Sequence, residues 1–138
     1  MLRDANGFSH VYLAAGKTDL RKGQDGLLMI IKNEFELNPF EPGNIFLFCG
    51  TRNHIIKALV FEEDGFVLLT KRLIHGRFQW PRHRQDAIEI SEKQYHQLMD
   101  GFAIEYRSTI EKSTSFISKS QAFFLIIITK IHSQISSH

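Results

Sequence analysis

Three apolar, β-rich runs follow one another in the middle of the chain, separated only by short turn sequences. The runs cover residues 44–49, 55–61 and 66–73, and the turns cover residues 50–53 and 62–65. Asp64 followed by Gly65 is a strong hairpin signal, since both residue types tolerate positive φ. Short strands joined in this way predict a meander of three antiparallel strands. This segment therefore requires a sheet at the centre of the fold.

The flanking segments predict two helices and additional strands. Residues 10–15 read as a short strand, and residues 87–90 as another. Residues 25–37 predict a helix with one broad apolar face, which Asn38–Pro39 ends. A second helix is expected from Ser91, capped with Gln94, to Asp100 before Gly101. We expect an α+β fold: a mostly antiparallel sheet of four or five strands, one main helix packed on it, and the second helix near the C-terminal end of the domain.

The chain of 138 residues has room for one compact domain, and its 43% hydrophobic and 23% charged residues are typical of globular proteins. We place this domain at residues 1–107. Residues 108–138 form a Ser/Ile-rich tail without glycine, proline or aspartate. The tail either docks on the core as a last strand or helix, or is foreign to the domain, for example through readthrough into another frame. The second interpretation is favoured because the tail is poorly patterned.

The cysteine content and the lengths of the apolar runs bear on the cellular location of the protein. Cys49 is the single cysteine, which excludes an intramolecular disulfide and favours a reducing compartment. The N-terminus has no apolar signal-peptide core, and the longest apolar run, Ala122–Ile128, is far shorter than the ~20 residues of a membrane helix. We expect a cytoplasmic protein.

Charge is distributed unevenly although the net charge is only +2. Residues 66–84 contain five basic side chains and no acidic one, whereas residues 85–111 are predominantly acidic. A dipolar molecule of this kind can present a positive face to phosphate. Phe78 and Trp80 lie among the basic residues and could stack on unpaired bases, but for Trp80 a role as core anchor is favoured.

A second basic cluster lies in the early turn at residues 18–23, where Arg21 and Lys22 precede the main helix. These cations could hold phosphate; alternatively, Asp19 pairs with Arg21 or caps the turn. We hypothesise that the early turn and the third meander strand converge in space to form a surface for polyanions. The candidate nucleic-acid-binding residues are Arg21, Lys22, Arg52, Lys57, Lys71, Arg72, Arg77, Arg82 and Arg84.

Catalytic patterns are weak. The carboxylates of Glu62, Glu63 and Asp64 are adjacent in a turn and point apart, which does not suit paired metal ions. The seven histidines show no metal-ligand spacing, and the early turn is not a phosphate-binding Walker loop. Cys49 with His54 could imitate a nucleophile and base, but a buried, inert thiol is favoured. We expect no catalytic residue, metal or cofactor.

Two stretches resemble a known family. The first is Thr18-Asp19-Leu20-Arg21-Lys22-Gly23-Gln24-Asp25-Gly26-Leu27, and the second is the series from Asn44–Phe48 through Lys57–Leu59, Asp64–Leu68 and Lys71–Leu73 to Gly76–Pro81. Together they resemble the TnpB-type accessory protein of insertion sequence sixty-six transposons, over roughly residues 8–104. The sequence departs from the family's pattern at residues 61–64 and in the tail.

The resemblance implies a non-catalytic role in DNA transposition beside a separate transposase of the same element. DNA is then the expected ligand of the basic residues. The alternative is a protein-interaction module that docks on the transposase without direct DNA contact. No catalytic residue carries over from the family.

Overall fold

The structure is a computed structural model, and it describes residues 1–105, which form one compact unit. Its elements are β1 (His10–Ala14), α1 (Gln24–Met29), η1 (Ile30–Glu34), β2 (Asn44–Cys49), β3 (Ile55–Phe61), β4 (Phe66–Arg72), β5 (Ala87–Ile90) and α2 (Glu92–Met99). The expected α+β class is confirmed. The expected domain end at Arg107 and the tail that follows it lie outside the described residues.

The five strands form one sheet in the order β4-β3-β2-β1-β5. Strands β2, β3 and β4 pair antiparallel in sequence order, which confirms the predicted meander. Strand β1 pairs parallel with β2 on one side and antiparallel with β5 on the other. Parallel neighbours need a long crossover connection, and the segment containing α1 and η1 supplies it.

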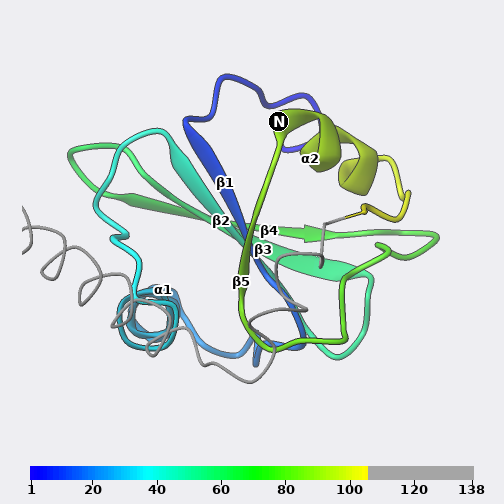
Figure 1. The fold of residues 1–138 in the computed structure, drawn as a ribbon, viewed down its shortest axis with the longest axis horizontal. Helices are drawn as coiled ribbons and strands as arrows, with labels where there is room; N and C mark the ends of the chain where they lie inside the picture. The colour runs from blue at the N-terminus through cyan, green and yellow to red at the C-terminus, as the bar shows by residue number, and fades with distance from the viewer. Residues whose placement is uncertain (106–138) are drawn as a thin grey trace, which may run out of the picture. The chain divides into compact units, whose positions relative to one another are not determined.

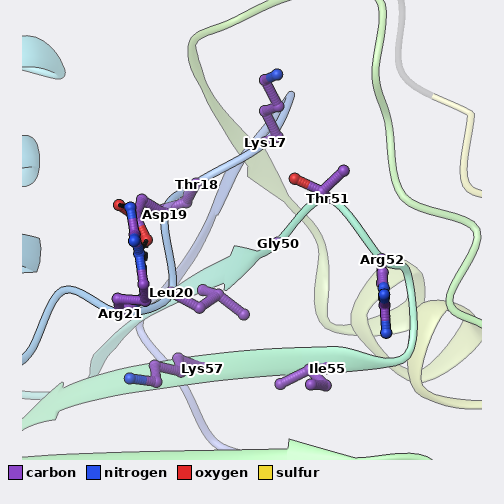
Figure 2. A pocket seen from close by; sticks show the side chains of 10 residues that line it. All are labelled: Lys17, Thr18, Asp19, Leu20, Arg21, Gly50, Thr51, Arg52, Ile55 and Lys57. Atoms are coloured by element: carbon purple, nitrogen blue, oxygen red, sulfur yellow. Dashed lines mark hydrogen bonds and ion pairs between the residues drawn. The ribbon is translucent and has the colours of Figure 1, made fainter.

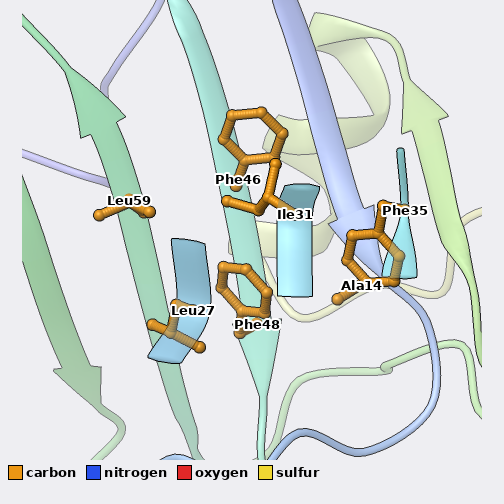
Figure 3. Packing of buried hydrophobic residues seen from close by; sticks show 7 residues of the cluster. All are labelled: Ala14, Leu27, Ile31, Phe35, Phe46, Phe48 and Leu59. Atoms are coloured by element: carbon orange, nitrogen blue, oxygen red, sulfur yellow. The ribbon is translucent and has the colours of Figure 1, made fainter. Parts of the chain in front are cut away.

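Helices cover both faces of the sheet (Figure 1). Leu27, Ile31 and Phe35 from the α1 and η1 segment form one buried cluster with residues of the sheet, and Figure 3 shows Leu27 and Ile31 beside Phe46 and Phe48 of β2 and Phe35 beside Ala14 of β1. Every residue of β2 is buried, so the alternate residues of this strand fill a second layer on the opposite face, where α2 lies. Strand β2 is therefore the central strand of the sheet and is buried on both faces.

The main helix was predicted at residues 25–37 as a single element, but it changes form in its second half. The Phe35 N–H donates to the Ile30 carbonyl at 3.0 Å, an i→i+5 bond that marks a π-helical turn. In an α-helix, residues four apart drift by about 40° at each step. The wider turn offsets this drift and keeps Phe35 on the sheet face. The helical part ends at Glu34, before Asn38, and Glu36 has a positive φ of 56°.

The second helix follows its sequence signals closely. The Ser91 hydroxyl accepts from the Gln94 N–H, and the Gln94 side chain accepts from the Ser91 N–H, which completes the predicted capping box. Gly101 follows the helix with a φ of 90°. Among residues 1–105, no helix has the length and apolarity needed to cross a membrane.

The hairpin turn between β3 and β4 differs in detail from the prediction. Asp64 and Gly65 are residue types that tolerate positive φ, but the positive angle in this turn, 70°, falls on Glu63. The Asp64 N–H donates to the Glu62 carbonyl at 2.8 Å, and the Glu62 N–H donates to the Gly65 carbonyl at 2.8 Å. The predicted hairpin is confirmed, and its one residue with positive φ, Glu63, lies just before the Asp-Gly pair.

Candidate nucleic-acid interface

The parallel strands β1 and β2 leave the sheet at the same end. The chain after β1 runs beside the end of β2, where the Thr18 N–H donates to the Cys49 carbonyl at 2.8 Å. A Cβ atom added at Gly50 would lie 3.2 Å from Leu20 Cδ1, so the close approach of the two segments favours glycine at this position. The carboxyl ends of parallel strands are common ligand sites.

An open depression of about 730 Å³ lies between these two segments (Figure 2). Figure 2 shows the side chains of Lys17, Arg52 and Lys57 arranged around it on three different segments. The lining residues are Lys17, Thr18, Asp19, Leu20, Arg21, Gly50, Thr51, Arg52, Ile55 and Lys57. Cations therefore outnumber carboxylates in this lining by four to one.

The one carboxylate of the lining, Asp19, is bound by Arg21. Its oxygens accept from the Arg21 Nε and Nη2 groups, each at 2.9 Å, and from the Arg21 backbone N–H at 3.0 Å. These bonds, the side-chain ones first, lower the pKa of Asp19 to about 2. The sequence left two interpretations of this turn open, and the one in which Asp19 pairs with Arg21 is confirmed. The Arg21 side chain remains 92% exposed.

The early turn also contacts β3. The Lys57 ammonium donates to the Lys22 carbonyl at 3.3 Å, so the backbone of Lys22 lies next to Lys57, which lines the depression. Arg72 of β4 lies opposite Ile55 in the strand register, on the sheet face that Ile55 and Lys57 share. Lys71 lies opposite Ile56 and so points to the other face.

A second hollow adjoins the depression through two shared residues, Thr51 and Arg52. Arg77 lines this hollow together with His54. Backbone bonds fix its walls: the Leu73 N–H donates to the His54 carbonyl at 2.8 Å, and the Phe78 N–H donates to the Asn53 carbonyl at 2.6 Å. Arg52 and Arg77 therefore extend the positively charged lining beyond the first depression.

Two of the predicted phosphate ligands are engaged inside the fold. The Arg82 guanidinium donates to the Gly16 carbonyl at 2.6 Å, and also to the Gly50 carbonyl and the Asn53 side-chain oxygen. Arg84 pairs with Asp86 at 2.9 Å, and both side chains are mostly buried. Lys17, in contrast, lines the depression although the candidate set omits it. Its position between Gly16 and the early turn was the signal that the sequence offered.

The aromatic and thiol groups near the site belong to the core. The Trp80 indole N–H donates to the Ala14 carbonyl at 2.9 Å, and both Trp80 and Phe78 are buried. Cys49 is fully buried, and burial raises the pKa of its thiol to about 11 against the opposing effect of Arg82. The core roles favoured for Trp80 and Cys49 are confirmed. Within residues 1–105, no three His, Cys, Asp or Glu side chains form a group that could hold a metal ion.

Comparison with known proteins finds the same family that the sequence motifs resemble. The family described as IS66 Orf2 like protein matches residues 9–109. Uncharacterized protein y4hO from Sinorhizobium fredii (strain NBRC 101917 / NGR234) is 38% identical over 91 residues, which cover 66% of this chain and 78% of that protein. Uncharacterized protein y4jC from the same strain is 26% identical over 91 residues, covering 66% and 77%. No solved structure matches the chain.

Proposed function

Because the chain belongs to the IS66 Orf2-like family, whose members have an accessory role in transposition, we propose that it fulfils this role by binding nucleic acid without catalysing a reaction. The proposed contact is the cationic surface, defined as Lys17, Arg21, Lys22, Arg52, Lys57 and Arg77. The transposase of the same element is the proposed partner in the reaction.

The observation that carries this proposal is the depression at the carboxyl ends of β1 and β2. Four of its lining residues are cationic, and the one carboxylate there, Asp19, is already bound by Arg21. Guanidinium and ammonium groups bind phosphate strongly because the hydrogen bond is charge-assisted. A polyanion entering the depression therefore meets an excess of positive charge.

The arrangement favours contact with the phosphate backbone over recognition of bases. Phe78 and Trp80, which lie within the basic segment of the sequence, are buried and present no face for stacking. Phosphate contacts fix the register of a protein on nucleic acid but carry no sequence information. We therefore expect strongly salt-dependent binding with little base preference.

The chemistry of Asp19 supports a non-catalytic role. A general base at neutral pH needs a pKa near 7, whereas Arg21 holds the pKa of Asp19 at about 2. Both Asp19 oxygens also accept hydrogen bonds from Arg21. The carboxylate is thus suited to positioning Arg21 and poorly suited to proton transfer.

The experiment measures the affinity of the full chain for labelled duplex DNA from the end of the element, by fluorescence anisotropy across a salt series. Each phosphate neutralised contributes about 0.9 to the slope of log affinity against log salt. Arg52→Gln combined with Lys57→Gln should lower the slope by roughly 2. The control, Lys32→Gln with Lys93→Gln, removes the same charge from exposed helical positions. An unchanged slope, or an equal loss in the control, would refute the proposal.

The same double variant separates the two uses of the surface that the sequence leaves open. If it loses DNA but still captures the purified transposase, the surface contacts DNA directly. If it loses the transposase and retains DNA, the surface docks on an acidic region of the transposase instead.

A further inference from the structure

Three phenylalanine rings cluster at the end of the β3–β4 hairpin that is remote from the depression. Phe61 and Phe66 face each other as the last pair of the strand register, with ring centroids 4.9 Å apart. Phe40 contacts both rings edge-on, at 5.6 and 5.4 Å. Phe40 is 50% exposed, so the cluster presents aromatic surface to solvent.

The loop that carries Phe40 is held in one conformation. Pro39 and Pro42 restrict its backbone on either side. The Phe40 N–H donates to the Asn38 side-chain oxygen at 2.9 Å, and the Asn44 side-chain amide donates to the Glu41 carboxylate at 3.1 Å. An aromatic side chain on such a loop loses little conformational entropy when it binds a partner.

Three carboxylate residues lie in the turn next to the aromatic cluster. Glu62, Glu63 and Asp64 form the exposed turn between Phe61 and Phe66. Residues 33–51 and 58–70 contain no lysine or arginine. Within residues 1–105, none of the three turn carboxylates forms an ion pair with a basic side chain. The positive φ of Glu63 holds this turn in a conformation that a glutamate adopts only at an energetic cost.

Strand β3 connects the two charged ends of the molecule. It starts at Ile55, which lines the cationic depression, and ends at Phe61 beside the acidic turn. A polyanion attracted to the first end is repelled by the second. The aromatic and acidic end therefore suits a ligand of opposite charge.

We propose that the acidic aromatic surface (Phe40, Phe61 and Phe66 with Glu62, Glu63 and Asp64) binds an arginine-containing segment of a second protein. A guanidinium group can donate to carboxylates at its edge and stack its flat face on an aromatic ring. Aromatic residues and arginine are also the side chains that dominate protein interfaces. The proposal uses none of the residues of the cationic surface, so it stands or falls independently of DNA binding.

The probe is a short labelled peptide in which arginine alternates with serine, compared with a lysine–serine peptide of equal length and charge. Binding to the full chain is followed by fluorescence anisotropy at low salt. The arginine peptide should bind more tightly than the lysine peptide, because only its planar group stacks on the rings. Equal affinities for the two peptides would overturn the proposal.

Two variants test the surface itself. Glu62→Gln with Asp64→Asn should weaken binding of the arginine peptide roughly three- to tenfold, as expected for exposed ion pairs. The control, Asp4→Asn with Asp25→Asn, removes the same charge from other exposed positions and should have little effect. Phe40→Ala should abolish the preference for arginine over lysine. Equal losses in the two double variants, or an unchanged preference in Phe40→Ala, would overturn the proposal.

Analytical ultracentrifugation of the wild-type chain tests whether a second copy of the chain, and not a separate partner, occupies the acidic aromatic surface. Concentration-dependent association that disappears in Glu62→Gln with Asp64→Asn would assign the acidic aromatic surface to a second copy of this chain. That result would overturn the proposal of a separate partner.

Discussion

Replacing Arg82 with lysine separates a structural role from direct contact with phosphate. The Arg82 guanidinium bonds the loop after β1 at Gly16 and the loop after β2 at Gly50 and Asn53. Both loops line the cationic depression. Lysine keeps the positive charge but has no planar fork, so it cannot bond all of these acceptors at once.

The cost follows from the number of bonds lost. A hydrogen bond from a charged donor contributes about 1.5–3 kcal/mol to stability. Lysine can retain one of the three oxygen acceptors, and because Arg82 is only half-buried the lower value applies to each of the other two. Arg82→Lys should therefore lower the free energy of unfolding by about 3 kcal/mol. For a domain near this size, such a loss corresponds to a fall in Tm of roughly 12 °C.

The assay is urea unfolding followed by the fluorescence of Trp80, which is buried in the native state. The control is Arg77→Lys, since Arg77 is exposed and its substitution should leave stability within about 0.5 kcal/mol of the wild type. If Arg82 instead served mainly as a phosphate ligand, Arg82→Lys would keep both the stability and the salt dependence of DNA binding. Equal stability of the two lysine variants would refute the structural role.

Three further predictions concern single residues. Ser91→Ala removes the cap of α2 and should cost about 1 kcal/mol, measured by thermal unfolding; a loss near zero would show that the capping box does not contribute. Burial raises the pKa of Cys49 from 9.0 to about 11, so the stability that this neutral thiol contributes should be complete below pH 9 and lost as pH rises through 11. Cys49→Ala should lack this alkaline loss, and an identical pH profile would contradict the assignment. Glu63→Gly should raise stability by roughly 1 kcal/mol by relieving the positive φ, and an equal gain in Glu63→Ala would exclude strain as the cause.

Strand and helix positions could be predicted closely because strong local signals surround them. The strands Asn44–Cys49, Ile55–Phe61 and Ala87–Ile90 have the predicted boundaries, since turn residues flank each apolar run. The π-helical turn at Ile30 could not be predicted, because it accompanies the packing of Phe35 in the buried cluster and no local residue pattern marks it. The positive φ of Glu63 likewise results from how β3 and β4 close their turn, which the Asp64–Gly65 signal does not specify.

The candidate site was less predictable because composition does not show which charges are already engaged. Arg77, Arg82 and Arg84 belong to one basic segment in the sequence, yet Arg77 lines an open hollow and the other two bond groups within the fold. The oxygen acceptors for Arg82 lie 29 to 66 residues away in the chain. Hydrogen bonds between a guanidinium group and acceptors so far away in the chain leave no local sequence pattern.

The direction of β1 decides whether a cationic depression exists at all. Strand β1 is parallel to β2, so the loops that follow both strands emerge at the same end of the sheet and bring Lys17 near Arg52. If β1 ran antiparallel to β2, as the other neighbouring strands do, residues 16–22 would emerge beside Asn44, at the end where the acidic turn lies. The basic and acidic ends would then be mixed. The crossover through α1 thus concentrates like charges at each end, with cations at the carboxyl ends of β1 and β2 and carboxylates in the turn between β3 and β4.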